Sequence, residues 1–128
     1  MSAELGTLVW VLALQLIMWV PYILNVVMVR GLVDAVGYPA NPKPMADWAQ
    51  RMKAAHSNAV ENLVVFAALV FVANVAGISN DTTVLACTVY FWARVVHFVS
   101  YTLGVPWVRT LAFAVSWAAM VAILMQLL

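Results

Sequence analysis

Long apolar stretches, separated by short polar breaks, dominate the pattern of hydrophobic and polar positions along this chain. The first extends from about residue 5 to 29 without a charged side chain, and three more cover about 48–77, 82–103 and 107–128. A transmembrane helix needs about 20 predominantly apolar residues. The pattern therefore predicts an all-α membrane protein with four transmembrane helices in an antiparallel up-down bundle, forming a single domain over residues 1–128.

The breaks between these stretches contain residues that end helices. The first break, residues 30–47, is the longest and holds two glycines and three prolines: Gly31, Gly37, Pro39, Pro42 and Pro44. Both residue types interrupt helices and supply turn geometry. The second break is a tight link at 78–81, and the third, at 104–107, contains Gly104 and Pro106. We expect loops at all three places and no further domain.

Composition supports lipid as the solvent of this chain. The 128 residues are 66% hydrophobic and only 9% charged, so a water-soluble domain of this size could not cover itself with polar surface. The first stretch is too long for the apolar region of a secretory signal, and we expect it to remain in the mature protein. The single cysteine, Cys87, excludes an internal disulfide and is expected to be buried and inert.

Basic side chains gather at one side of the predicted membrane. Lysine and arginine favour the cytoplasmic flanks of transmembrane helices. Five of the six lie in or beside the first and third connections: Arg30, Lys43, Arg51, Lys53 and Arg109. We therefore expect loops 30–47 and 104–107 to be cytoplasmic and both termini to be periplasmic or lumenal. The basic residues form no dense patch, which argues against nucleic-acid binding.

Polar side chains inside the spans form one stripe on each of two helices. The second-helix stripe consists of Arg51, Asn58, Glu61 and Asn62. The third-helix stripe, at i, i+4, i+7 and i+11, consists of Tyr90, Arg94, His97 and Tyr101. Helical periodicity places each set on or near one face. Because ionisable groups in membrane helices usually face protein or a watery cavity, we expect the two stripes to face each other.

The depth of each side chain in the membrane indicates which of them can meet. A helical rise of 1.5 Å per residue puts Glu61 and Arg94 both roughly 15 Å from the cytoplasmic face, so we expect them to form an ion pair. Asn58 and His97 both come out roughly 10 Å deep. The shallower Arg51, Tyr101 and Arg109 would surround an opening toward the cytoplasm. The sequence thus predicts a polar, cationic pocket.

Other roles for these residues remain open at this point. Glu61 and Arg94 could fix the register of the helices without touching a ligand, His97 could bond one helix to another, and Tyr101 could be an interface aromatic. The remaining basic candidates could be topology signals only: Arg51, Lys53 and Arg109. A metal site is not expected, because His56, His97 and Glu61 lack the close spacing of helical metal ligands. A transport relay is a third alternative, although only Pro21 interrupts a span.

Two sequence blocks resemble those of a known family. Ala55–Asn62 matches the pattern A-H-x-N-x-x-E-N, and Arg94–Tyr101 matches R-x-x-H-x-x-x-Y. Pro106–Thr110 is similar to the short link that follows these blocks. Together they resemble the MAPEG family, the membrane-associated proteins in eicosanoid and glutathione metabolism, over about residues 51–128. One position departs from several eukaryotic members, which have arginine where this chain has Ala54.

The resemblance implies a homotrimer with glutathione, as cosubstrate, bound between neighbouring protomers near the cytoplasmic face. The residues it assigns to glutathione binding are Arg51, Asn58, Glu61, Arg94, His97 and Tyr101, and it gives thiolate stabilisation to Arg109. Arg30 and Lys53 are further candidates, although Lys53 projects about 100° away from the position of Ala54. The compact chain is similar to prokaryotic members, which implies a bacterial inner membrane.

The function expected from pocket and resemblance together is that of a membrane glutathione transferase or peroxidase. It would join a glutathione thiolate to apolar electrophiles, or reduce lipid hydroperoxides, that arrive from the surrounding membrane lipids. A guanidinium near a thiol favours the nucleophilic thiolate, which suits Arg109. The alternative is a non-catalytic membrane protein that binds a lipid or thiol ligand in the same cleft between protomers.

Overall fold

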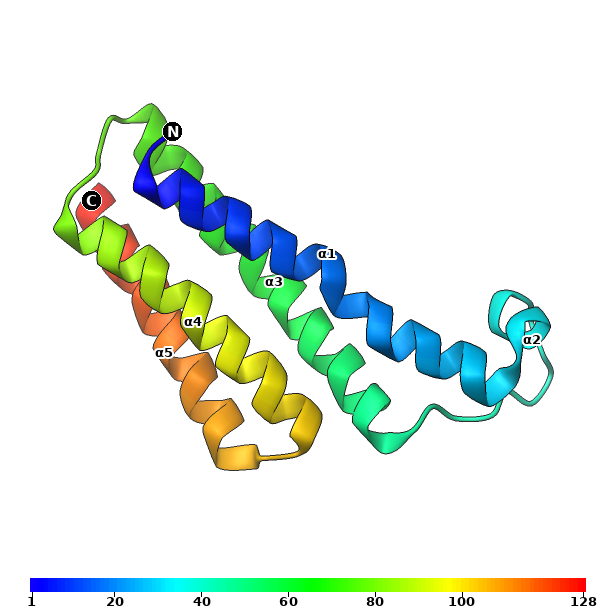
Figure 1. Cartoon of the computed structure of the whole chain (residues 1–128). Coiled ribbons are helices and arrows are strands. Elements are labelled where there is room, and N and C mark those ends of the chain that lie inside the picture. Colours follow the sequence, from blue (N-terminus) through cyan, green and yellow to red (C-terminus); the bar gives the residue numbers. More distant parts are fainter.

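Apolar helices form almost the whole of the computed structural model, which describes residues 1–128 (Figure 1). The four long helices are α1 (Ala3–Arg30), α3 (Asp47–Val75), α4 (Asp81–Leu103) and α5 (Pro106–Leu127). Each is long and apolar enough to cross a membrane. They run alternately up and down, so that both termini lie at the same end of the bundle (Figure 1). The prediction of an all-α protein with four spans is confirmed.

The observed boundaries follow from local capping chemistry. The Ser2 side chain accepts a hydrogen bond from the Leu5 N–H at the start of α1. Asn80 and Thr83 form a reciprocal capping box at the start of α4. Such caps satisfy N–H groups that the first helical turn leaves unpaired. Pro106 occupies the first turn of α5, where no N–H is needed.

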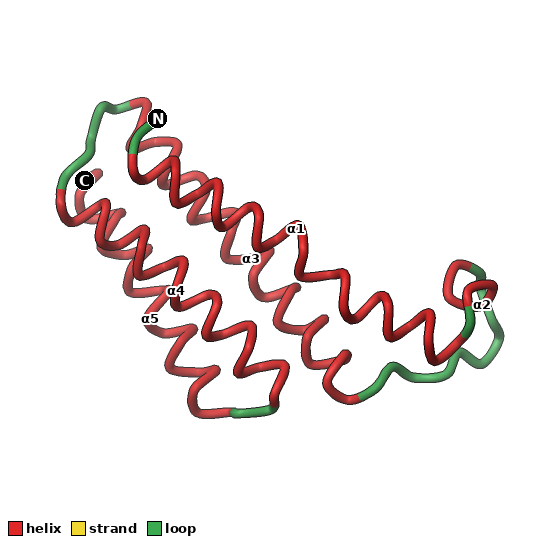
Figure 2. Tube along the Cα trace, viewed as in Figure 1, coloured by secondary structure: helices red, strands yellow, loops and turns green.

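The first connection holds one element that the sequence pattern did not predict. A five-residue helix, α2 (Leu32–Val36), lies between Gly31 and Gly37, inside the stretch expected to be only loop (Figure 2). Five residues are too few to show a helical repeat of apolar positions, and the flanking glycines indicated a loop. The connection is fastened to the bundle at two places. The Arg30 Nε donates to the Lys43 carbonyl at 2.7 Å, and the Ala46 N–H donates to the Asn25 side chain at 2.9 Å.

The core lies between the helices and is small, because most apolar side chains face outward. Its larger part centres on Phe66 and Tyr90, whose rings stack with centroids 3.8 Å apart. A smaller part, nearer the end of the bundle that carries the first connection, joins Tyr22, Ala49 and Met52. Large apolar side chains such as Leu16 and Trp107 are exposed on the outside. Exposing so many apolar side chains to water would be strongly unfavourable in free energy, whereas lipid solvates them.

Candidate functional site

Arg94 is the most deeply buried charged side chain of the protein, with 2% of its surface exposed. Its Nη2 donates to the Asn58 Oδ1 at 2.6 Å, and its Nη1 donates to the Ser116 Oγ at 3.3 Å. The partners lie on α3 and α5, so one guanidinium ties three helices together. Its Nε has no hydrogen-bond partner. The two polar stripes therefore face each other, and Asn58 rather than a carboxylate is where they meet.

The predicted ion pair between Glu61 and Arg94 is wrong. Glu61 is exposed on the outside of the protomer, and the hydrogen bonds of Arg94 go to Asn58 and Ser116 instead. The reason lies in the rotation of α3 about its axis. Ala59 is 2% exposed and marks the packed face of α3. Because Glu61 follows two residues later, it lies about 200° around the helix from that face.

Aromatic and cationic side chains follow Arg94 toward the C-terminal end of α4. His97 is buried, with its Nδ1 3.4 Å from the Arg94 Nη2. Its ring meets the Tyr101 ring edge-on, with centroids 5.5 Å apart. The Arg109 guanidinium, from the start of α5, lies over the Tyr101 ring at 4.5 Å from the centroid. This is a cation–π contact, which orients a guanidinium without neutralising its charge.

Two polar cavities open on either side of the Tyr101–Arg109 contact. The inner chamber has a volume of about 210 Å³ and is lined by Asn58, His97, Tyr101, Arg109, Thr110 and Phe113. The outer chamber has a volume of about 230 Å³ and is lined by Arg51, Tyr101, Gly104, Val105, Pro106 and Arg109. No acidic residue lines either chamber. Both are therefore cationic and suited to anionic groups of a ligand.

The remaining predicted site residues do not line these chambers. Arg30 binds the Lys43 carbonyl within the first connection, while Lys53 and Glu61 are exposed. Asn62 donates to the Asn58 carbonyl and side chain, and so helps to orient the Asn58 amide. In a protomer taken alone, the structure thus gathers Arg51, Asn58, Arg94, His97, Tyr101 and Arg109.

Sequence reasoning missed three contributors to the site. Ser116 is fully buried, accepts from Arg94 and donates to the Phe113 carbonyl at 2.8 Å. It is the one polar side chain in the middle of an otherwise apolar stretch, a signal that could have identified it. Thr110 lines the inner chamber and Gly104 the outer one. Their roles depend on how the α4–α5 turn packs against α3, which spacing along the chain does not show.

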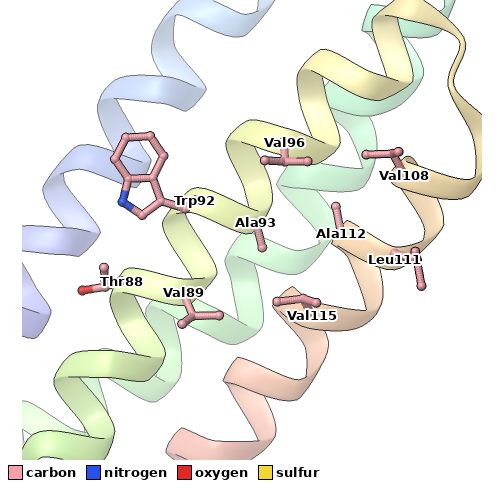
Figure 3. Close-up of a pocket in the computed structure, with 9 residues that line it drawn as sticks. All are labelled: Thr88, Val89, Trp92, Ala93, Val96, Val108, Leu111, Ala112 and Val115. Atoms are coloured by element: carbon pink, nitrogen blue, oxygen red, sulfur yellow. The ribbon is translucent and has the colours of Figure 1, made fainter.

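A larger cavity of opposite character is lined by α4 and α5 alone. Its volume is about 450 Å³. Side chains from both helices, among them Trp92 and Val96 on α4 and Leu111 and Val115 on α5, surround it (Figure 3). Thr88 is the only polar residue in its lining. An apolar molecule dissolved in the bilayer would fit this environment, whereas the charged groups of a peptide would not.

A second polar contact joins α1 to α3 away from the chambers. The Tyr22 hydroxyl lies 2.9 Å from the His56 Nδ1, at hydrogen-bond distance. No cavity described above includes His56. Cys87 is a buried free thiol. No group of three histidine, cysteine or carboxylate side chains is arranged as a metal site.

Comparison with protein families gives one match. The model of the MAPEG family matches residues 7–128, nearly the whole chain. The match extends beyond the blocks at 55–62 and 94–101, into the first span. Comparison with curated proteins and with solved structures gives no match.

Proposed function

This chain belongs to the MAPEG family of integral membrane proteins, and on that premise we propose that it is a glutathione-dependent enzyme acting on apolar electrophiles. Members of the family include glutathione transferases and peroxidases. The observation that carries the proposal is the placement of Arg109. This guanidinium lines both polar chambers, rests on the Tyr101 ring and makes no hydrogen bond within the chain.

The chambers suit a small, charged thiol. Asn58, His97 and Tyr101 offer hydrogen-bonding groups in the inner chamber, and the Arg94 charge lies directly behind Asn58. A charge in a low-dielectric site acts more strongly than in water. Arg109 would stabilise the thiolate of glutathione, since a nearby cation favours the deprotonated, nucleophilic form of a thiol. The sulfur would then attack an electrophilic carbon, form a carbon–sulfur bond and expel the leaving group.

A peroxidase reaction would use the same thiolate. The sulfur attacks one oxygen of a lipid hydroperoxide, the oxygen–oxygen bond breaks, and the alcohol leaves with a proton. The first glutathione now carries a sulfenic acid. A second glutathione attacks that sulfur, the hydroxyl leaves as water with one proton, and the disulfide forms. This chemistry needs no metal, and the apolar lining of the cavity on α4 and α5 would suit such substrates.

Glu61 supports the homotrimer that the family implies. Its carboxylate is exposed on the outside of a transmembrane helix, and a carboxylate facing hydrocarbon is costly. A neighbouring copy of the chain would cover it and place it beside the bound glutathione, where it would accept the ammonium group. The complete site would then lie between protomers.

The test is glutathione conjugation to 1-chloro-2,4-dinitrobenzene by purified protein. We expect the wild type to conjugate, and Arg109→Ala to lose about a hundredfold in kcat, the usual effect of removing one charge-stabilising group. Lys53→Ala, which removes an exposed cation outside both chambers, should retain the wild-type kcat. Equal rates for wild type and Arg109→Ala would reject the role given to Arg109.

The second candidate is a non-catalytic protein that binds a lipid or thiol in the same chambers. It is favoured by Ala54, which leaves out a guanidinium that several family members carry. Binding of glutathione without conjugation above background, in wild type and Arg109→Ala alike, would support this candidate.

A further inference from the structure

A separate cavity, which we call the aromatic cavity, is lined by α1 and α4 alone. Its volume is about 440 Å³, and its lining consists of Thr7, Trp10, Thr88, Phe91 and Trp92. A volume of this size is typical of small-molecule sites. Trp10 and Trp92 are 67% and 60% exposed, so their rings are not used up in packing the core. The rings of Phe91 and Trp92 stack with centroids 5.2 Å apart. Three aromatic side chains thus border one open cavity.

The aromatic cavity lies apart from the two polar chambers. Trp92 precedes Arg94 by two residues, which places it about 200° around α4 from that side chain. Thr88 lies roughly 10 Å along the helix from the start of α4 at Asp81, on the basis of a rise of 1.5 Å per residue. Thr7 is near the start of α1, at the same end of the bundle (Figure 1). The cavity is therefore inside the span, in the half nearer the termini, and a ligand would reach it from the bilayer.

The polar atoms of this lining have a defined hydrogen-bonding capacity. The Thr7 hydroxyl donates to the Ala3 carbonyl at 3.1 Å. The Thr88 hydroxyl donates to the Val84 carbonyl, also at 3.1 Å. Because each hydroxyl has one proton, both threonine oxygens can offer only lone pairs to a ligand. The indole N–H of Trp92 can only donate, and no group of the chain accepts from it.

The donor and an acceptor are turned the same way. Thr88 and Trp92 also border the apolar cavity between α4 and α5. Figure 3 shows the Trp92 nitrogen and the Thr88 oxygen on one side of α4, the side away from α5. This is the side of the aromatic cavity, whose other lining residues include two from α1. A ligand there meets a hydrogen-bond donor and an acceptor together.

The chemistry of the lining selects one class of ligand. No charged residue lines the cavity, so a charged group would lose its hydration without compensation. Aromatic side chains favour the face or edge of a flat ring. A hydroxyl group both accepts and donates, so it can pair with the indole and with a threonine at once. An ether or carbonyl oxygen can only accept, and would pair with the indole alone.

We propose that the aromatic cavity is a binding site for a neutral, membrane-soluble phenol, the class to which the head of a quinol belongs. The phenol hydroxyl accepts from the Trp92 N–H and donates to the Thr88 oxygen, with Thr7 as the other acceptor. The ring of the ligand lies among the rings of Trp10, Phe91 and Trp92. This ligand is distinct from glutathione, and its site shares no residue with the polar chambers.

The test compares 4-octylphenol with its methyl ether, 4-octylanisole, which has the same ring and tail but no donor. The dissociation constant of each compound is measured by native mass spectrometry of the purified full chain. The wild type should bind the phenol about fivefold more tightly than the ether, the usual effect of one neutral hydrogen bond. This comparison needs the wild type only, and so does not depend on the folding of a variant.

Variants with matched controls locate the site. The double variant Thr7→Val/Thr88→Val keeps the shape of the lining and removes both acceptors, so it should bind phenol and ether alike. Trp92→Leu removes a ring, and should weaken the binding of both compounds about fivefold. Thr102→Val is the control for the threonines, since Thr102 also donates within its own helix, at 2.8 Å, but lies outside the cavity. Trp117→Leu is the control for Trp92, since Trp117 is 57% exposed on α5. Both controls should bind like the wild type, and thermal unfolding checks that each variant is folded.

Three results would overturn the site. One is a wild type that binds neither compound. Another is a wild type that binds phenol and ether equally, which would mean that the cavity takes lipid tails only. The third is a preference for phenol that survives in the double threonine variant, or an equal loss of binding in Trp92→Leu and Trp117→Leu. Glutathione conjugation by the wild type is measured separately, so failure of the phenol site and failure of the proposed function are distinguishable.

Discussion

Inside the bundle, the Arg94 guanidinium donates a 2.6 Å hydrogen bond to the side-chain oxygen of Asn58, and so joins α4 to α3. The acceptor is a neutral amide, so the arginine charge is held without being cancelled. Arginine stays protonated in proteins, and here its charge lies behind one wall of the inner chamber while Arg109 lies on another. The chamber is therefore cationic from two directions, which is the electrostatic argument for the proposed thiolate site.

Removal of the Asn58 side chain should destabilise the protein. Asn58→Ala would leave a nearly fully buried guanidinium with only two long contacts, to Ser116 at 3.3 Å and to His97 at 3.4 Å. A hydrogen bond to a buried charge contributes about 2 kcal/mol, and we expect a loss of that size. The measurement is the free energy of unfolding in detergent. Ser57→Ala, at the neighbouring exposed position, is the control and should unfold like the wild type, whereas equal losses in both variants would contradict this role of Asn58.

The sequence predicted the helices well and the partners of their polar groups only in part. Four spans follow from apolar length alone, because lipid requires every backbone group of a span to be paired within a helix. Depth along a helix follows from a fixed rise per residue, but it put Glu61 level with Arg94 and Asn58 level with His97, whereas the structure joins Arg94 to Asn58. Rotation about the helix axis is set by packing. The near-complete burial of Ala55 and Ala59 turns Glu61 outward.

The small residues of the second span indicate how α3 is rotated about its axis, although its polar residues alone suggested a different rotation. Ala55 and Ala59 are spaced by four residues and are 0% and 2% exposed, as expected where two membrane helices approach closely. Had they been taken as the packed face, Asn58 rather than Glu61 would have been the expected partner of Arg94. The contact of Arg51 with Gly104 could not be predicted in this way, because it depends on a turn that is distant in sequence.

Loss of the Tyr22 hydroxyl should loosen α1 from α3. Tyr22→Phe removes the 2.9 Å contact with the His56 Nδ1 and keeps the buried ring. One hydrogen bond contributes about 1 kcal/mol, so we expect thermal unfolding at a lower temperature. Tyr38→Phe is the matched control, since Tyr38 is fully exposed. An unchanged unfolding temperature for Tyr22→Phe would show that this contact adds no stability.

The ring of Tyr101 should matter for kcat through Arg109. Tyr101→Leu removes the surface on which the guanidinium rests at 4.5 Å, and we expect a fall of about tenfold in kcat, the upper range of one cation–π contact. Tyr101→Phe keeps the ring, so it should keep kcat and change only the KM for glutathione. Steady-state kinetics would check this, and a kcat that fell equally in both variants would place the effect in the hydroxyl instead.

Accessibility of engineered cysteines should show the proposed orientation. Ala76→Cys and Ala40→Cys place thiols in the connections at opposite ends of the bundle (Figure 1), each in a Cys87→Ser background. With basic loops in the cytoplasm, a membrane-impermeant maleimide should label the position 76 variant in intact bacterial cells and the position 40 variant only after lysis. The reverse pattern would invert the topology and place the chambers on the outer side.

The central claim is that glutathione binds in the two chambers beside Arg109, and a density map of the protein in lipid nanodiscs with saturating glutathione tests it most directly. The map should show a trimer, with the thiol between Asn58 and Arg109 and with density extending past Tyr101. A map with those chambers empty, or with glutathione bound elsewhere on the protein, would contradict the account.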